Sequence, residues 1–232
     1  MNYSFPEEVS RIPVEQVVMK KLRNSMLWMA WGVLTTFVTI LGALFNPQWL
    51  AMASHNYTWI LLIELGVVIL FSARQLTASV TSLKAMFFIY SILTGLTLAV
   101  LSTYYGTTAF FYAFLGTVAF FGTFAVVGAV TKRDLTSFST YLVVALIAMI
   151  IMMLLNAFVF ESSGFSMLLG ALGVVIFTIF TVVDVNRIKH MLVQVAHEDE
   201  SVLERVELIG ALSLYLDFIN LFLSILRFVR RD

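Results

Sequence analysis

The sequence predicts an all-α membrane protein with seven transmembrane helices. Of the 232 residues, 60% are hydrophobic and 12% are charged, whereas soluble domains have about 45–50% apolar and about 25% charged residues. A helix needs about 20 mostly apolar residues to span a bilayer. Seven runs approach that length: 26–45, 57–73, 85–103, 109–130, 139–160, 166–186 and 206–228. None alternates as a barrel strand would, so we expect a helical bundle.

The runs are separated by short polar breaks, which leave no room for a second domain. We therefore expect a cytoplasmic N-terminal tail, residues 1–25, followed by a single seven-helix domain, residues 26–232. The three prolines lie outside the apolar runs, so no proline-broken helix is predicted. Small residues are expected to let the helices approach closely. The candidates are Gly116, Gly122, Gly128, Gly170 and Gly173.

The basic residues predict that the N-terminus is cytoplasmic, because Lys and Arg are enriched in cytoplasmic loops. They occur in the tail and after the second, fourth and sixth runs: Arg11, Lys20, Lys21, Arg23, Arg74, Lys84, Lys132, Arg133, Arg187, Lys189 and Arg205. The opposite loops, 46–56, 104–108 and 161–165, carry none. Seven crossings would then place a basic C-terminus outside, which conflicts with the same rule. The last helix either crosses against the rule or enters the bundle without a conventional crossing.

The last run is the most polar of the seven. Asp217, Asn220 and Ser224 stand at positions i, i+3 and i+7, so they share one helical face. That face either lines a water-filled cavity or bonds a neighbouring helix, and it should not face lipid. We therefore expect the last helix to be central and surrounded by the other six.

Three of the acids inside apolar runs are singled out as candidates: Glu64, Asp184 and Asp217. A carboxylate at membrane depth costs about 2.5–3.5 kcal/mol on insertion scales, so such residues are usually functional. With no basic residue in mid-span, they favour a cation as the passing species, and Ca²⁺ prefers oxygen ligands. The structural alternatives are an ion pair between Asp184 and Arg187, three residues apart, and a hydrogen-bond anchor at Asp217. If the two aspartates are close, they would share one proton and respond to pH.

Other classes of function find less support in the sequence. There is no Cys, which excludes a disulfide, a thiolate metal site and a cysteine nucleophile. The three histidines lack metal spacing, and no Gly-rich phosphate loop, HExxH or GxSxG motif is present. A net charge of zero gives no indication of nucleic-acid binding. We expect no enzyme and no cofactor, although an intramembrane protease using Asp184 and Asp217 stays open as a rival.

Two segments resemble a known family. SLYLDFINLFLSILRF, residues 213–228, resembles the C-terminal signature of the Bax inhibitor-1 family, and VVDVNRIKHM, residues 182–191, resembles its sixth-helix segment. Glu64 in an apolar second helix and KRDLTSF at 132–138 also fit. The resemblance covers nearly the whole chain. It implies a bacterial, multi-pass protein of the cell inner membrane, with the last of seven helices wrapped by the others.

The resemblance also implies a function, a pH-sensitive calcium leak through the membrane. The pH sensor and gate would be a hydrogen-bonded aspartate pair between helices 6 and 7, which maps onto Asp184 and Asp217. An arginine at the end of helix 2 would latch the closed state, and Arg74 is the nearest match. The candidate pore-lining residues are Glu64, Asn220 and Ser224, and the two aspartates are candidate Ca²⁺ ligands.

A different function is implied on the same fold. Some bacterial relatives bind and modulate a membrane-anchored ATP-dependent protease. The alternative is therefore a non-transporting regulator of membrane proteolysis or stress survival. Its docking segment would be the N-terminal tail, residues 1–24.

Overall fold

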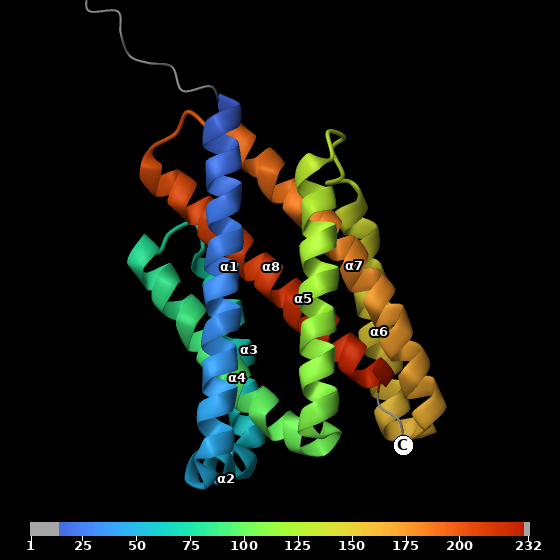
Figure 1. Cartoon of the computed structure of the whole chain (residues 1–232). Helices are drawn as coiled ribbons and strands as arrows, with labels where there is room; N and C mark the ends of the chain where they lie inside the picture. Colours follow the sequence, from blue (N-terminus) through green and yellow to red (C-terminus); the bar gives the residue numbers. More distant parts are fainter. Residues whose placement is uncertain (1–13, 230–232) are drawn as a thin grey trace, which may run out of the picture.

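The computed structural model describes residues 14–229, which form helices and no strand (Figure 1). Seven of the helices are long and apolar enough to cross a membrane, which confirms the predicted fold class. They are α1 (Val14–Phe45), α3 (Tyr57–Arg74), α4 (Val80–Tyr105), α5 (Thr107–Val130), α6 (Phe138–Leu155, continued by the π-helical η1, Asn156–Phe160), α7 (Ser163–Gln194) and α8 (Glu200–Val229).

An eighth, short helix lies in the predicted loop 46–56. This α2 runs from Pro47 to His55. Its start follows from local chemistry: the Asn46 side chain accepts hydrogen bonds from the amides of Gln48 and Trp49, and Pro47 occupies the first position, where its missing N–H costs nothing.

The helix α1 begins at Val14, twelve residues before the predicted apolar run. With 32 residues it is about 48 Å long, which exceeds a hydrocarbon core of about 30 Å. Residues 14–25, predicted as a tail, therefore form the first turns of α1, whereas residues 1–13 lie outside the described residues. The helices α7 and α8 also extend beyond their apolar runs, at the same end of the bundle (Figure 1).

The last helix, α8, is central, as predicted. It packs against α7, α1, α5 and α4 and crosses the bundle obliquely (Figure 1). Leu208, Leu214, Tyr215 and Leu221 of α8 are fully buried. The helices α3 and α6 lie further out and pack mainly on α4 and α7, respectively. The sequence predicts that six helices surround α8, whereas in the structure four helices pack directly against it and two lie further out.

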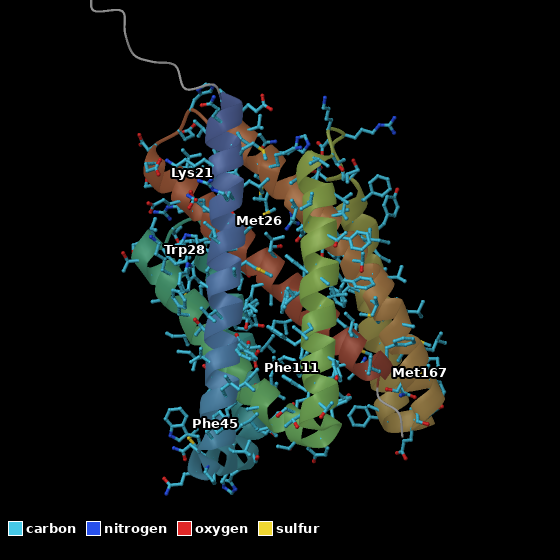
Figure 2. The ribbon with its side chains drawn as sticks, in the orientation of Figure 1. Lys21, Met26, Trp28, Phe45, Phe111 and Met167 are labelled. Atoms are coloured by element: carbon cyan, nitrogen blue, oxygen red, sulfur yellow. The ribbon has the colours of Figure 1, made fainter. Side chains whose placement is uncertain are left out.

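The outer surface of the bundle is apolar. Phe45, Phe111 and Met167, labelled in Figure 2, are 85%, 50% and 48% exposed. Aliphatic and aromatic side chains of similar exposure occur along α3, α5 and α6. Such an extensive apolar surface exceeds what monomeric soluble proteins display, and it is suited to contact with lipid.

Glycines bring α7 close to both of its long neighbours. A Cβ atom at Gly128 of α5 would lie 2.5 Å from a backbone oxygen of α7, and one at Gly170 would lie 2.9 Å from a backbone nitrogen of α8. Gly173 faces a serine of α8. These three positions confirm the packing expected of small residues. Gly116 and Gly122 have no such neighbour within 4 Å.

The bundle has two distinct ends. The start of α1, the α5–α6 loop and the α7–α8 turn lie at one end, whereas α2, the α4–α5 turn and the end of α8 lie at the other (Figure 1). The last helix therefore crosses the bundle completely. Of the predicted C-terminal basic residues, Arg227 lies in the last turn of α8, whereas Arg230 and Arg231 lie outside the described residues.

Candidate functional site between α7 and α8

Asp184 and Asp217 lie on two helices that pack against each other along their length, α7 and α8. Their exposed fractions are only 4% and 6%. Close packing near the site is supported by Gly210 of α8, where a Cβ atom would lie 3.0 Å from the side chain of Ile188. Asp184, near the end of its apolar run, is thus buried as deeply in the bundle as Asp217.

Asp184 is held by two partners. Its Oδ2 accepts a hydrogen bond from Arg187 Nη2 at 3.1 Å and a short one from the Ser213 hydroxyl. Arg187 Nη2 also lies 3.1 Å from Ser213 Oγ. The ion pair expected from the i, i+3 spacing is therefore present. It does not exclude a functional role, because the same carboxyl group reaches α8 through Ser213.

Asp217 lies one helical turn beyond Ser213, on the same side of α8. Its charged neighbours are Asp184 and Arg187. Asp217 Oδ2 and Asp184 Oδ1 are both buried without a hydrogen-bond partner. Among the described residues, the hydrogen bonds link Asp184 to Ser213 and Arg187 and include none between the two carboxyl groups. Each carboxyl group thus keeps one buried oxygen unsatisfied, which is costly unless a proton or a cation binds there.

Arg74, the predicted latch, lies away from this site. It is the last residue of α3 and its side chain is exposed. None of the ion pairs found among residues 14–229 includes it. The guanidinium beside Asp184 belongs to Arg187, which sequence reasoning considered only as a local partner.

Glu64 forms a separate polar contact between α3 and α4. Its two carboxylate oxygens accept hydrogen bonds from the hydroxyls of Thr94, at 2.6 Å, and Thr97, at 3.0 Å. Glu64 therefore binds a hydroxyl pair on an outer helix interface, and the structure does not bring it together with the two aspartates.

Asn220 and Ser224 continue the polar face of α8 beyond Asp217. The Asn220 amide donates to the carbonyl of Leu216 at 2.8 Å, and the Ser224 hydroxyl donates to the carbonyl of Asn220 at 2.7 Å. Ser224 also packs against Gly173 of α7. The shared face predicted from their spacing is thus turned toward α7, with its hydrogen bonds kept inside α8.

Sequence reasoning missed Asn186 and Lys189, which bind the α5–α6 loop. The fully buried Asn186 side chain donates to the carbonyls of Thr131 and Arg133 and accepts from the amide of Leu135, over 2.9–3.1 Å. Lys189 donates to the carbonyl of Ala129 in the last turn of α5, at 3.0 Å, and to that of Thr131 just after the helix, at 2.6 Å. The polar residues of VVDVNRIKHM therefore divide between two faces: Asp184 and Arg187 bind toward α8, whereas Asn186 and Lys189 bind toward α5.

The α5–α6 loop is also ordered by its own residues. The Thr136 amide donates to Asp134 Oδ1 at 2.8 Å. Hydrogen bonds from the hydroxyl and the amide of Thr136 hold the pKa of the exposed Asp134 carboxyl below its usual value. This carboxylate stays ionised at neutral pH, at the end of the bundle where α1 begins.

The aspartate site offers few ligands to a metal ion. No group of three or more His, Cys, Asp or Glu within residues 14–229 is arranged to hold a metal. Two carboxyl groups and the Ser213 hydroxyl are hard oxygen ligands, but a tightly bound Ca²⁺ takes six to eight. The chemistry of this donor set therefore fits brief contact with a passing cation better than a resident one.

Comparison with known proteins decides the family. Residues 18–232 match the family described as Inhibitor of apoptosis-promoting Bax1. The chain belongs to the Bax inhibitor-1 family. The family signature resembled by residues 213–228 carries Ser213 and Asp217, so the motif and the buried site of this Bax inhibitor-1 protein coincide.

Several bacterial relatives share most of the chain. Inner membrane protein YbhL of Escherichia coli K12 is 35% identical over 205 residues, 86% of each chain. An uncharacterized protein of Borreliella burgdorferi is 38% identical over 176 residues, 76% of this chain and 75% of its own. Uncharacterized protein RP147 of Rickettsia prowazekii is 33% identical over 219 residues, 91% of this chain and 92% of its own. Together with the seven apolar helices, the relative named as an inner membrane protein supports a multi-pass inner membrane protein.

Proposed function

We propose that this Bax inhibitor-1 family protein is a pH-sensitive leak channel for calcium and similar cations, gated by Asp184 and Asp217. One observation carries this function: two buried carboxyl groups lie on packed helices, and each has an oxygen without a hydrogen bond. A proton or a cation would satisfy those oxygens. The proposed channel senses protons and conducts cations, and both species would suit the site.

The direction of the pH response follows from the charges. At low pH the two carboxyl groups share a proton, and a carboxyl–carboxylate hydrogen bond links α7 to α8 and closes the path. At higher pH both groups ionise, and Arg187 neutralises only one of the two charges. The remaining repulsion in a low-dielectric site separates the helices and leaves a net negative charge that attracts cations. Opening therefore increases as pH rises.

We also propose that the N-terminus lies in the cytoplasm and that the path opens toward that side. Lys132, Arg133 and Lys189 belong to the end of the bundle where α1 begins (Figure 1), and the loops at the opposite end carry no Lys or Arg. This asymmetry is the pattern of cytoplasmic and external loops. The proposed role is passive conduction and includes no catalytic step.

Calcium flux into liposomes that contain the purified protein, measured from low to high pH, tests this function. We expect flux to rise with pH. Asp217→Asn should abolish most of the pH dependence, because a neutral amide cannot take part in proton sharing. Asp184→Asn should act in the same way, and the double variant should show less than the sum of the two effects if the residues form one unit.

The matched control is Asp134→Asn, which removes an exposed carboxyl group in the α5–α6 loop. It should leave the pH profile unchanged. Flux that is indifferent both to pH and to Asp217→Asn would rule out the gating role of the pair.

A further inference from the structure

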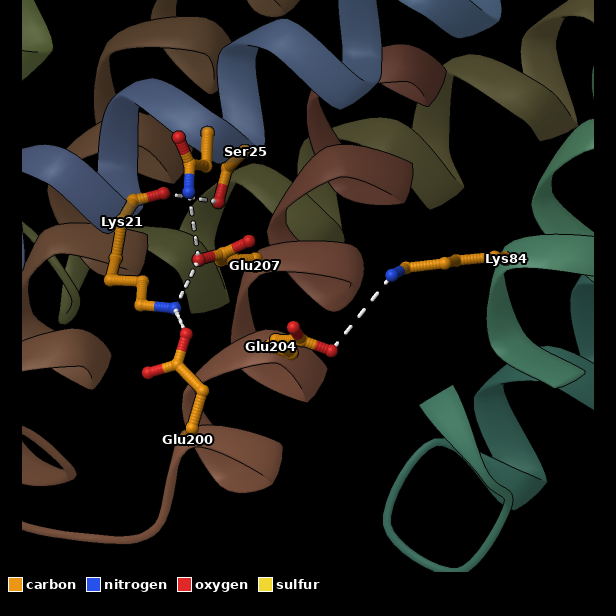
Figure 3. A network of polar contacts seen from close by, with 7 residues as sticks. Lys21, Ser25, Lys84, Glu200, Glu204 and Glu207 are labelled. Atoms are coloured by element: carbon orange, nitrogen blue, oxygen red, sulfur yellow. Dashed lines mark hydrogen bonds and ion pairs between the residues drawn. The ribbon is translucent and has the colours of Figure 1, made fainter. Parts of the chain in front are cut away.

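A second buried acid on α8 forms a contact that the aspartate site does not involve. Glu207 is 3% exposed and precedes Asp217 by ten residues, or about 15 Å along the helix. Its Oε1 lies 2.8 Å from Nζ of Lys21 on α1, which is 4% exposed (Figure 3). The Asn24 amide donates to the same oxygen at 3.1 Å.

Lys21 also joins a second carboxylate of α8. Its Nζ lies 2.5 Å from Glu200 Oε1, and the Glu200 side chain is 70% exposed (Figure 3). The lysine thus bridges two acids that lie two turns apart on α8, one inside the bundle and one at its surface. Within the described residues, these contacts hold the start of α8 to the start of α1.

A neighbouring ion pair provides a contrast. Lys84 of α4 and Glu204 of α8 lie 3.8 Å apart, and their side chains are 35% and 37% exposed (Figure 3). Solvent and salt screen such a pair, so it contributes little. The Lys21–Glu207 pair is buried, so separating its members would leave an uncompensated charge in the bundle.

The helix α8 is therefore bound to neighbouring helices at two positions along its length. Near its start Glu207 binds α1, and in its middle Ser213 binds Asp184 and Arg187 of α7. Any motion that moves α8 away from α7 while α1 stays in place must strain or break the buried pair. We propose that Lys21 and Glu207 form a second latch, which favours the closed position of α8 and helps to set the pH at which the aspartate pair separates. This latch rests on the proposed channel function.

The decisive variant is the double substitution Lys21→Met/Glu207→Gln. It removes the buried ion pair and keeps similar side-chain volumes, and the one charge that loses its partner is the exposed Glu200 carboxylate. We expect the closed-to-open ratio to fall about tenfold, which shifts the midpoint of opening about one pH unit lower if one proton is released. The charge exchange Lys21→Glu/Glu207→Lys, combined with Glu200→Gln so that two carboxylates do not meet, should restore the wild-type midpoint. The control Lys84→Met/Glu204→Gln should shift it by less than about 0.3 units.

A distance measurement tests the latch without calcium flux. Because the chain has no Cys, Arg23→Cys on α1 and Ser201→Cys on α8 introduce the only two thiols, both at exposed positions. Spin labels at these positions report the α1–α8 distance by pulsed electron resonance. In the wild type at low pH we expect one narrow distribution, and in Lys21→Met/Glu207→Gln a longer or broader one.

The possible results separate the latch from the channel. An unchanged midpoint in the double variant, or an unchanged distance distribution, would overturn the latch while leaving the aspartate gate intact. If the wild-type protein conducts calcium at no pH, the proposed channel function is wrong. The spin-label distances would still show whether the Lys21–Glu207 pair holds α8 to α1. A well-folded charge-exchange variant that behaves like the neutral variant would also contradict a role for the ion pair.

Discussion

At the scale of single residues, the buried acids differ in the partners that stabilise their carboxyl groups. Glu207 has Lys21, Glu64 has two threonine hydroxyls, and Asp184 has Arg187 and Ser213. Asp217 forms no ion pair with any of residues 14–229, and its Oδ2 lacks a hydrogen-bond partner. A buried ionised group without a partner is expensive. Asp217 is therefore the buried acid whose charge its neighbours compensate least.

Arg187 should tune the pH response of the gate. Its positive charge favours the ionised form of Asp184, so Arg187→Gln should hold the pair in its proton-sharing state to higher pH. We expect the midpoint of calcium flux to rise by about one pH unit, the effect of one nearby opposite charge.

The same measurement compares the two candidate arginines. Arg74→Gln, which removes an exposed charge at the end of α3, should leave the midpoint unchanged. A shift with Arg74→Gln and none with Arg187→Gln would restore Arg74 as the latch and argue against the role given to Arg187.

At the scale of elements, α7 connects the aspartate site to the rest of the bundle. One of its faces binds α8 through Asp184 and Arg187, and another binds the α5–α6 loop through Asn186 and Lys189. Glycines bring its backbone close to both α5 and α8. A displacement of α7 at the site would therefore also affect the loop that follows α5.

Asn186→Ala should loosen the α5–α6 loop. The substitution removes three hydrogen bonds and leaves loop carbonyls and an amide without their buried partner. The cost should be about 2–3 kcal/mol of unfolding free energy. Hydrogen exchange should show faster exchange of the Leu135 amide, whereas Ser162→Ala, at the far end of α7, should leave that amide protected. Unchanged protection in Asn186→Ala would show that the loop is held by other contacts.

At the scale of the whole molecule, α8 forms the centre of a bundle whose outer helices face lipid. Its polar residues face α7, α1 and α4, where hydroxyls, an amide and cations satisfy most of them. The helices α1, α7 and α8 extend beyond the apolar runs at one end of the bundle. The contacts of Lys21 with Glu200 and Glu207 lie there, and so does the α5–α6 loop. Contacts at this end thus bind the first turns of α8, while Asp217 lies further along the helix.

The predicted orientation can be tested with single thiols, because the chain has no Cys. Tyr104→Cys lies at the end of the bundle opposite to the start of α1, and Arg133→Cys lies in the α5–α6 loop. A membrane-impermeant maleimide should label Tyr104→Cys in intact spheroplasts. It should label Arg133→Cys only after the membrane is disrupted. The reverse pattern would place the N-terminus outside and contradict the basic-residue rule for this protein.

The fold class, the seven helices and the central position of the last one could be predicted without a structure, because hydropathy and polar spacing are properties of single segments. The sequence also singled out Asp184 and Asp217, since a charge inside an apolar run is visible without a structure. Which groups meet across helices depends on the tertiary structure. It joined Asp184 to Ser213 of α8, left Arg74 at the surface, and placed Lys21, in the stretch predicted as a tail, against Glu207. Such partners lie up to 186 residues apart along the chain, and only packing brings them within hydrogen-bond distance.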